Sequence, residues 1–158
     1  MTKPICVTVM SLVFLFANYT LGLACSCAYI GPLEMYKSAD GVFTGVVTTK
    51  TAVDQYGIPF FRVEFRVTGV WKGINTSTVH VSTSSSGASC GVNLLPTEEY
   101  LVYAFDYGES PSGPWRTHLC TRTRRLEYAQ EDLEAIGDPS PEPLSNSTWG
   151  RVKALYEN

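Results

Sequence analysis

Four cysteines are the residues of this chain whose type and spacing could carry chemistry. Cys25 and Cys27 are separated by a single residue, whereas Cys90 and Cys120 lie far along the chain. Cysteines can form disulfides, bind zinc as thiolates or act as a redox pair. The C-x2-C spacing typical of structural zinc sites does not occur. The sequence therefore favours disulfides over a zinc site made of all four cysteines.

Spacing narrows the choice of cysteine pairs without deciding it. Four cysteines allow three pairings, and a Cys25–Cys27 bridge would close a very small, strained ring. In each of the two remaining pairings, Cys25 and Cys27 are tied to Cys90 and Cys120. Each such bridge constrains the unfolded chain by roughly 3–5 kcal/mol in the chain-entropy model. A thiol oxidoreductase using Cys25-Ser26-Cys27 would instead need free thiols.

Residues 1–24 are predicted to be a signal peptide. Lys3 precedes an apolar stretch, residues 5–17, that is short for a membrane-spanning helix. Gly22 and Ala24 are small residues of the kind that signal peptidase accepts, so Cys25 is predicted to begin the mature chain. A membrane anchor and a bacterial lipoprotein signal are the alternatives. We expect a secreted, extracellular protein, periplasmic or surface-lipidated if bacterial, with no membrane span in the mature chain.

The other polar residues form no recognisable catalytic motif. His80 alternates with valines and is expected to point to solvent, while His118 has no acidic partner at a recognisable spacing. The motifs of serine hydrolases, zinc peptidases and phosphate-binding loops do not occur in the sequence. The sequence therefore does not predict an enzyme.

The charged residues and the glycosylation sequons indicate what the surface of the protein carries. Arg122, Arg124 and Arg125 form a basic patch, which we interpret as a solvated face. The net charge of −3 gives no broad attraction to phosphate backbones, so nucleic acid is not an expected partner. Asn75 and Asn146 each begin a sequon and are predicted glycan acceptors if the source is eukaryotic.

The segments that must position the cysteines are mostly strands of one domain. The chain has 158 residues, of which 44% are hydrophobic and 17% charged, enough for one globular core. The clearest strand places one set of residues inward, Phe61, Val63, Phe65 and Val67, and another set outward, Arg62, Glu64 and Arg66. Further strands are predicted at residues 41–49, around Val79 and Val81, at 100–105 and in a short segment ending at Cys120. Short strands in series predict a barrel or sandwich.

Helices and connections are predicted around these strands. A short helix is expected within residues 30–39 and another at 126–136, where Leu126, Ala129, Leu133 and Ile136 recur at helical spacing. Residues 54–59 are a predicted turn and 82–89 a polar loop. The domain is predicted to end at residue 137. A Pro-rich linker with a short C-terminal helix, residues 138–158, follows it.

Together, several short motifs resemble the tissue inhibitors of metalloproteinases, in their N-terminal netrin-like domain. The resemblance covers residues 25–137, and the order and spacing of all four cysteines are its most specific part. It is carried by Cys25-Ser26-Cys27, Ala39-Asp40, Ser89-Cys90-Gly91, Glu98-Glu99-Tyr100-Leu101 and Cys120. It implies a mainly β fold, a five-stranded OB-type (netrin-like) barrel with flanking short helices, and the pairs Cys25–Cys90 and Cys27–Cys120. The chain lacks the family's usual third disulfide in this domain, and residues 41–45 replace a basic segment of the first strand.

The resemblance also implies a function. Such proteins inhibit zinc metalloproteinases by chelating the catalytic zinc through the backbone amine and carbonyl oxygen of the first residue, here Cys25. The protease-binding residues would be Cys25, Ser26, Cys27, Ala88, Ser89 and Cys90. The chain would have no cofactor of its own, would share the zinc of its target protease and would be monomeric when free. The alternative hypothesis is a non-inhibitory netrin-like module for extracellular interactions.

Overall fold

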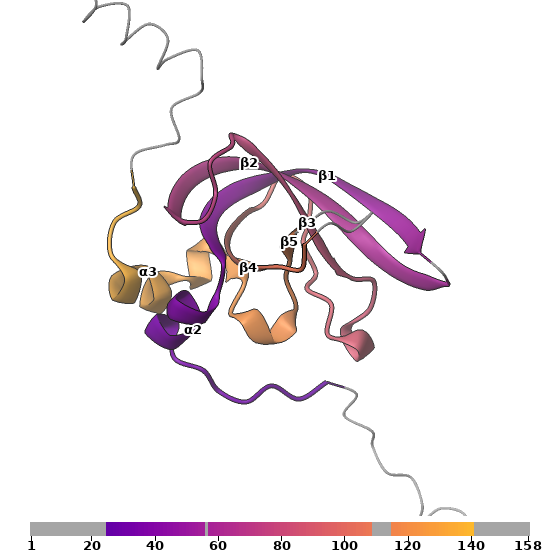
Figure 1. Cartoon of the computed structure of the whole chain (residues 1–158), viewed down its shortest axis with the longest axis horizontal. Helices are drawn as coiled ribbons and strands as arrows, with labels where there is room; N and C mark the ends of the chain where they lie inside the picture. The colour runs from indigo at the N-terminus through magenta and orange to yellow at the C-terminus, as the bar shows by residue number, and fades with distance from the viewer. Residues whose placement is uncertain (1–24, 56, 109–114, 141–158) are drawn as a thin grey trace, which may run out of the picture.

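The computed structural model describes residues 25–140, except residues 56 and 109–114 (Figure 1). In chain order its elements are α2 (Pro32–Ser38), β1 (Gly41–Gln55), β2 (Ile58–Lys72), β3 (Thr78–Ser84), the 3-10 turn η1 (Gly87–Ser89), β4 (Glu99–Asp106), β5 (Trp115–Arg116), the 3-10 turn η2 (Leu119–Thr121), β6 (Arg124–Arg125), the 3-10 turn η3 (Leu126–Tyr128) and α3 (Gln130–Ile136). The predicted signal peptide and the predicted helix at 148–156, with Asn146, lie outside the described residues.

Five of the strands close into a barrel. The hydrogen-bonded order is β1-β2-β3-β5-β4, and β1 pairs again with β4, which closes the ring. Among the described strands β3 and β5 run parallel, and the other pairs are antiparallel. The short β6 adds to β4 outside this ring. The predicted mainly β, five-stranded OB-type barrel with flanking short helices is confirmed.

The first strand is longer than predicted because it serves both the barrel and a projecting hairpin. Residues Gly41–Val46 pair with β4 on one side, while β2 pairs with β1 along its whole length. Bulges interrupt the β1–β2 register at three places and let these long strands bend into a closed wall. The hairpin tip projects from the barrel (Figure 1), with its turn tightened by a hydrogen bond from the Gly57 amide to Asp54.

The barrel interior is apolar and follows the predicted register of β2. Phe65 and Val63 are fully buried, Val67 is nearly so, and Phe61 packs on the same cluster. On the other face Arg66 is exposed, as predicted, while Arg62 and Glu64 are half-buried. Glu64 is half-covered because it accepts a hydrogen bond from Thr48 and pairs with His80 at 3.2 Å. His80 itself is exposed, as predicted.

A second apolar cluster joins the barrel wall to the helices. Successive β4 residues alternate between the two clusters, with Tyr100 and Val102 inside the barrel and Leu101 and Tyr103 under the helices. Burial on both faces explains the unbroken apolar run of this strand. The two helices α2 and α3 lie side by side and cover this face of β4 (Figure 1).

Three predicted elements differ from the structure in extent. The polar loop expected at residues 82–89 begins only after β3 ends at Ser84. The helix expected at residues 126–136 is divided into η3 and α3, because Ala129 (φ −98°, ψ 12°) leaves the helical conformation. Its apolar residues Leu126, Ala129, Leu133 and Ile136 still join one cluster. The strand expected to end at Cys120 is limited to β5, because the residues around Cys120 turn into η2 under a cap from the side chain of His118.

Candidate functional site

Two disulfides hold the N-terminal segment, residues 25–31, against two loops of the barrel. Cys25 is bonded to Cys90 and Cys27 to Cys120, with Cα–Cα distances of 5.6 and 5.2 Å. This is the pairing that the resemblance implies, and one of the two that spacing alone leaves open. Between the bridges Ser26 is exposed, and Cys25 is half-buried. The structure thus brings residues 25–27 beside the loop that contains residues 88–90.

That loop is held by its own polar contacts. The Ser86 hydroxyl caps η1 by accepting a hydrogen bond from the Ser89 amide, and the Ser84 and Ser89 hydroxyls are in contact. Cys90 adopts a left-handed conformation (φ 63°), and the Gly91 amide then donates back to the Ser86 carbonyl at 2.8 Å. Ala88 and Ser89 are exposed. We call residues 25–27 together with 87–90 the ridge.

A third segment, residues 118–120, is hydrogen-bonded to the ridge. The sequence did not predict this role. The Leu119 amide donates to the Cys90 carbonyl at 2.8 Å, and the Cys120 amide donates to Nδ1 of His118 at 3.3 Å. Burial lowers the pKa of His118, which keeps Nδ1 available as an acceptor. The Leu119 side chain is 49% exposed. The short spacing from His118 to Cys120 is compatible with a cap, but no local signal marks Leu119.

Buried hydroxyl groups tie this segment to β4. Thr117, Thr121 and Thr123 are buried and lie within hydrogen-bonding distance of one another, at 2.7 to 3.1 Å. Thr123 accepts a hydrogen bond from the Tyr103 amide, and Thr117 donates to the Tyr103 carbonyl. These side chains satisfy backbone groups of β4 that lie between the short pairings with β5 and β6.

The sulfur atoms do not form a metal site of the chain's own. Sγ of Cys25, Cys27 and Cys120 lie within 4.8 Å of one another, a separation that could suit a metal. All three sulfurs are engaged in disulfides, so they offer no thiolate to a zinc ion.

The predicted basic face is corrected by the structure. Arg122 is buried, with a side chain only 7% exposed, while Arg124 and Arg125 are about one third exposed. The reason is that Nε of Arg122 meets the fully buried Asp132 at 2.7 Å, and this hydrogen bond raises the pKa of Arg122 above its ordinary value. The pKa of Tyr103 is also raised, mainly by burial and to a smaller extent by the charge of Asp132. The Tyr103 hydroxyl donates to the same carboxylate at 3.0 Å.

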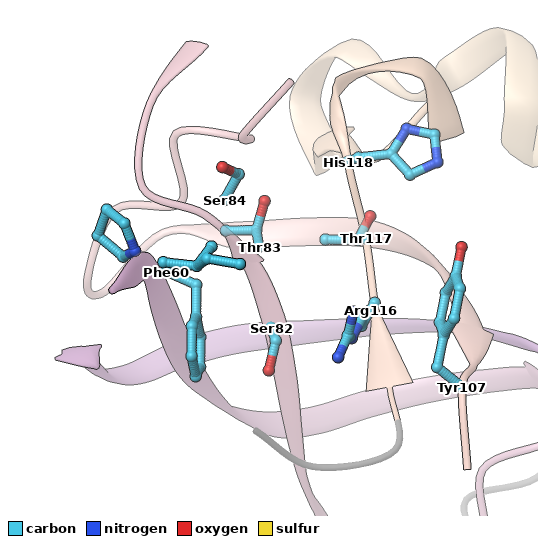
Figure 2. Close-up of a pocket in the computed structure, with 10 residues that line it drawn as sticks. Phe60, Ser82, Thr83, Ser84, Tyr107, Arg116, Thr117 and His118 are labelled. Carbon is cyan, nitrogen blue, oxygen red and sulfur yellow. The ribbon is translucent and has the colours of Figure 1, made fainter. Parts of the chain in front are cut away.

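A pocket of about 480 Å³ opens next to the ridge. Figure 2 shows Ser82, Thr83 and Ser84 along β3, with Arg116, Thr117 and His118 along the segment beside it. The Tyr107 ring lies 5.1 Å from the guanidinium carbon of Arg116. Two of the lining residues also support the ridge, since Ser84 contacts Ser89 and His118 caps the turn that holds Cys120.

Neither helix in the described part of the chain is long and apolar enough to cross a membrane.

Comparison with known proteins shows a distant homology. No protein-family model matches the chain. Curated relatives named metalloproteinase inhibitor 2, from Homo sapiens, Rattus norvegicus and Cricetulus longicaudatus, are each 26% identical over 121 residues. The match covers 66% of this chain, and 55% of the human and rat relatives and 62% of the Cricetulus relative. The chain therefore spans less than two thirds of the length of these relatives.

Proposed function

We propose that this distant homologue of metalloproteinase inhibitor 2 is a secreted protein inhibitor of zinc metalloproteinases. In this proposal the mature chain begins at Cys25, whose α-amine and carbonyl oxygen chelate the zinc of the protease. The observation that carries the proposal is the ridge, in which two disulfides hold Cys25-Ser26-Cys27 against the barrel with Cys25 half-buried and Ser26 and Cys27 exposed. The homology supports an inhibitor rather than an enzyme.

Elementary coordination chemistry makes such a terminus a suitable zinc ligand. A catalytic zinc keeps one position open for water or substrate. An N-terminal residue carries an amine and a carbonyl oxygen close enough to bind that zinc together. The reference pKa of an α-amine is about 7.7–8.0, so a neutral, ligating fraction exists near neutral pH. The bridges at Cys25 and Cys27 would reduce the entropy lost when the terminus becomes ordered on binding.

The remaining ridge residues have roles that follow from size and charge. Ser26 would enter the pocket of the protease next to the zinc, where a small neutral hydroxyl avoids burying a charge. Ala88 and Ser89, which are exposed beside the Cys25–Cys90 bridge, would form a second line of contact. The inhibitor would bring no cofactor of its own and would share the zinc of its partner, meeting it as a monomer.

The proposed location is extracellular, where disulfides persist. Asn75, a proposed glycan acceptor, is exposed in the turn between β2 and β3. From that turn β3 runs for seven residues before the chain reaches the ridge loop. This distance is about 20 Å at the usual rise per strand residue, so a glycan at Asn75 would leave the ridge accessible.

The decisive experiment adds one alanine before Cys25. The extension moves the terminal amine by about 3.8 Å and turns the original amine into an amide, a very poor zinc ligand. We expect inhibition of a panel of zinc endopeptidases to fall by orders of magnitude. The melting temperature should remain nearly constant, because the added residue lies outside both bridges and the barrel.

A cleavable extension provides the matched control. Removal of the extension by a site-specific protease that leaves Cys25 at the terminus should restore inhibition. Equal inhibition by the extended and native proteins would contradict chelation. If neither form inhibits any peptidase of the panel, the non-inhibitory interaction module becomes the better hypothesis.

A further inference from the structure

Arg122 forms a buried contact between the N-terminal segment and α3. Its Nη1 donates to the Ile30 carbonyl at 3.0 Å, three residues after the Cys27–Cys120 bridge. Its Nε and Nη2 meet the two oxygens of Asp132 at 2.7 and 2.9 Å, and Nη2 also meets Glu131 at 2.7 Å. The guanidinium therefore links a backbone atom of the N-terminal segment to two side chains of α3.

Tyr29 adds a second contact at the same place. Its ring lies 5.8 Å from the guanidinium carbon of Arg122, and its hydroxyl donates to Glu131 at 3.3 Å. The side chain of Tyr29 is nevertheless 80% exposed. Burial of Tyr29 therefore contributes little to holding this backbone, and the apolar contact of the segment comes from Ile30, which is half-buried against the second cluster.

The disulfides alone leave this backbone free to rotate. A bridge fixes the position of a sulfur atom, whereas the direction of the chain also depends on the dihedral angles on either side of it. Ala28 and Tyr29 are exposed, and regular secondary structure begins only at Pro32. The hydrogen bond to Ile30 thus acts on the part of the segment that the bridges control least.

We infer that Arg122 is a positioning residue, which sets the direction of the N-terminal segment and hence of the Cys25 amine and carbonyl. As a statement about zinc chelation this inference rests on the proposed function. Arginine suits the role because its planar fork can meet a bidentate carboxylate and a backbone carbonyl at once. A lysine at this position keeps the charge, but its three donors diverge from one nitrogen, so it cannot reproduce the planar fork that meets Asp132 through two nitrogens and Ile30 through a third.

The test compares Arg122→Lys with Arg124→Lys as the matched control. Arg124 approaches the same carboxylate at 3.7 Å, and its Nε donates to the carbonyl of Arg122 rather than to the N-terminal segment. The first readout is the backbone order parameter of the free, mature protein, measured by NMR relaxation. In Arg122→Lys we expect the order parameters of residues 28–30 to fall from about 0.85, typical of rigid backbone, to below about 0.6. The values in α3 and in the control should stay unchanged.

The second readout is inhibition by the same variants. Loss of one charge-assisted hydrogen bond should weaken inhibition by Arg122→Lys about tenfold or more, with no change in the control. Unchanged order parameters at residues 28–30 would overturn the inference. Lowered order parameters with unchanged inhibition would overturn its link to chelation. If the native protein inhibits no peptidase, the proposed function fails, while the order parameters still decide whether Arg122 positions the segment.

A second variant tests the same inference if Arg122→Lys does not fold. Arg122→Met combined with Asp132→Asn removes both charges together, so no unpaired charge is left buried, and methionine has no donor for the Ile30 carbonyl. The same loss of order at residues 28–30 is expected, and retained order in this folded variant would equally overturn the inference.

Discussion

At the scale of single residues, His118 links the protonation state of the protein to the ridge. Nδ1 accepts a hydrogen bond from the amide of Cys120, which is bonded to Cys27. The ring also stacks on Phe105, with a centroid distance of 6.4 Å. Protonation would convert the acceptor into a donor and place a charge in a desolvated position.

The first prediction concerns the dependence of stability on pH. Burial lowers the pKa of His118 in the folded state below its ordinary value of 6.5. The unfolded chain therefore binds a proton at a higher pH than the folded chain does. This contribution to stability is present above about pH 6.5 and is lost as the pH falls through the folded-state pKa. We expect the free energy of unfolding, from urea titrations, to decrease between about pH 7 and pH 5.

An asparagine at the same position provides the control. His118→Asn keeps an oxygen that can cap η2 but does not titrate in this range. Its free energy of unfolding should vary less between pH 7 and pH 5 than that of the native protein. An identical pH profile in the two proteins would contradict a role for His118.

At the scale of elements, β2 supplies much of the barrel interior. Phe65 is fully buried, with edge-to-face contacts to Phe43 at 5.6 Å and to Tyr100 at 6.4 Å between ring centroids. These contacts join β2 to β1 and to β4, and β1 lies between β2 and β4 in the ring. Phe65→Ala should therefore lower the free energy of unfolding by about 3–5 kcal/mol, measured by chemical denaturation.

The neighbouring residue tests the register of the same strand. Arg66 is exposed on the opposite face, so Arg66→Ala should change the free energy of unfolding by only about 0.5 kcal/mol. A loss below about 1 kcal/mol for Phe65→Ala would be incompatible with its position in the core.

At the scale of the whole molecule, the disulfides connect the N-terminal segment, residues 25–31, to two loops of the barrel. The Cys27–Cys120 bridge closes a loop across 93 residues. Replacing both cysteines by serine should lower the free energy of unfolding by roughly 2–5 kcal/mol, because the unfolded chain gains freedom. The strand pairings should persist, as shown by an unchanged far-ultraviolet circular dichroism spectrum, because residues 25–31 belong to no strand.

The same variant should also lose inhibition if the proposed function is correct. With Cys27 released, the terminus would lose one of its two covalent links to the barrel and keep the Cys25–Cys90 bridge. Full inhibition by this variant, or a free energy of unfolding equal to that of the native protein, would contradict the predicted role of the bridge.

The sequence by itself determined the features that depend on near neighbours along the chain. Alternation in β2 predicted which side chains of residues 61–67 face the core, because successive strand residues point to opposite faces. The apolar run at residues 100–105 predicted the strand that the structure has as β4. The even number of cysteines left after a predicted signal peptide indicated bridges, and their order and spacing indicated the family resemblance.

Only the tertiary structure decided the features that depend on distant residues. Local pattern could not choose between the two long-range cysteine pairings, because each partner lies 65 or 93 residues away. Nor could it show that Arg122 is buried, since this follows from Asp132 on α3 and from Ile30, 92 residues earlier. A charged side chain is expected at the surface unless a partner offsets its loss of water, and that partner is found only when the chain has folded.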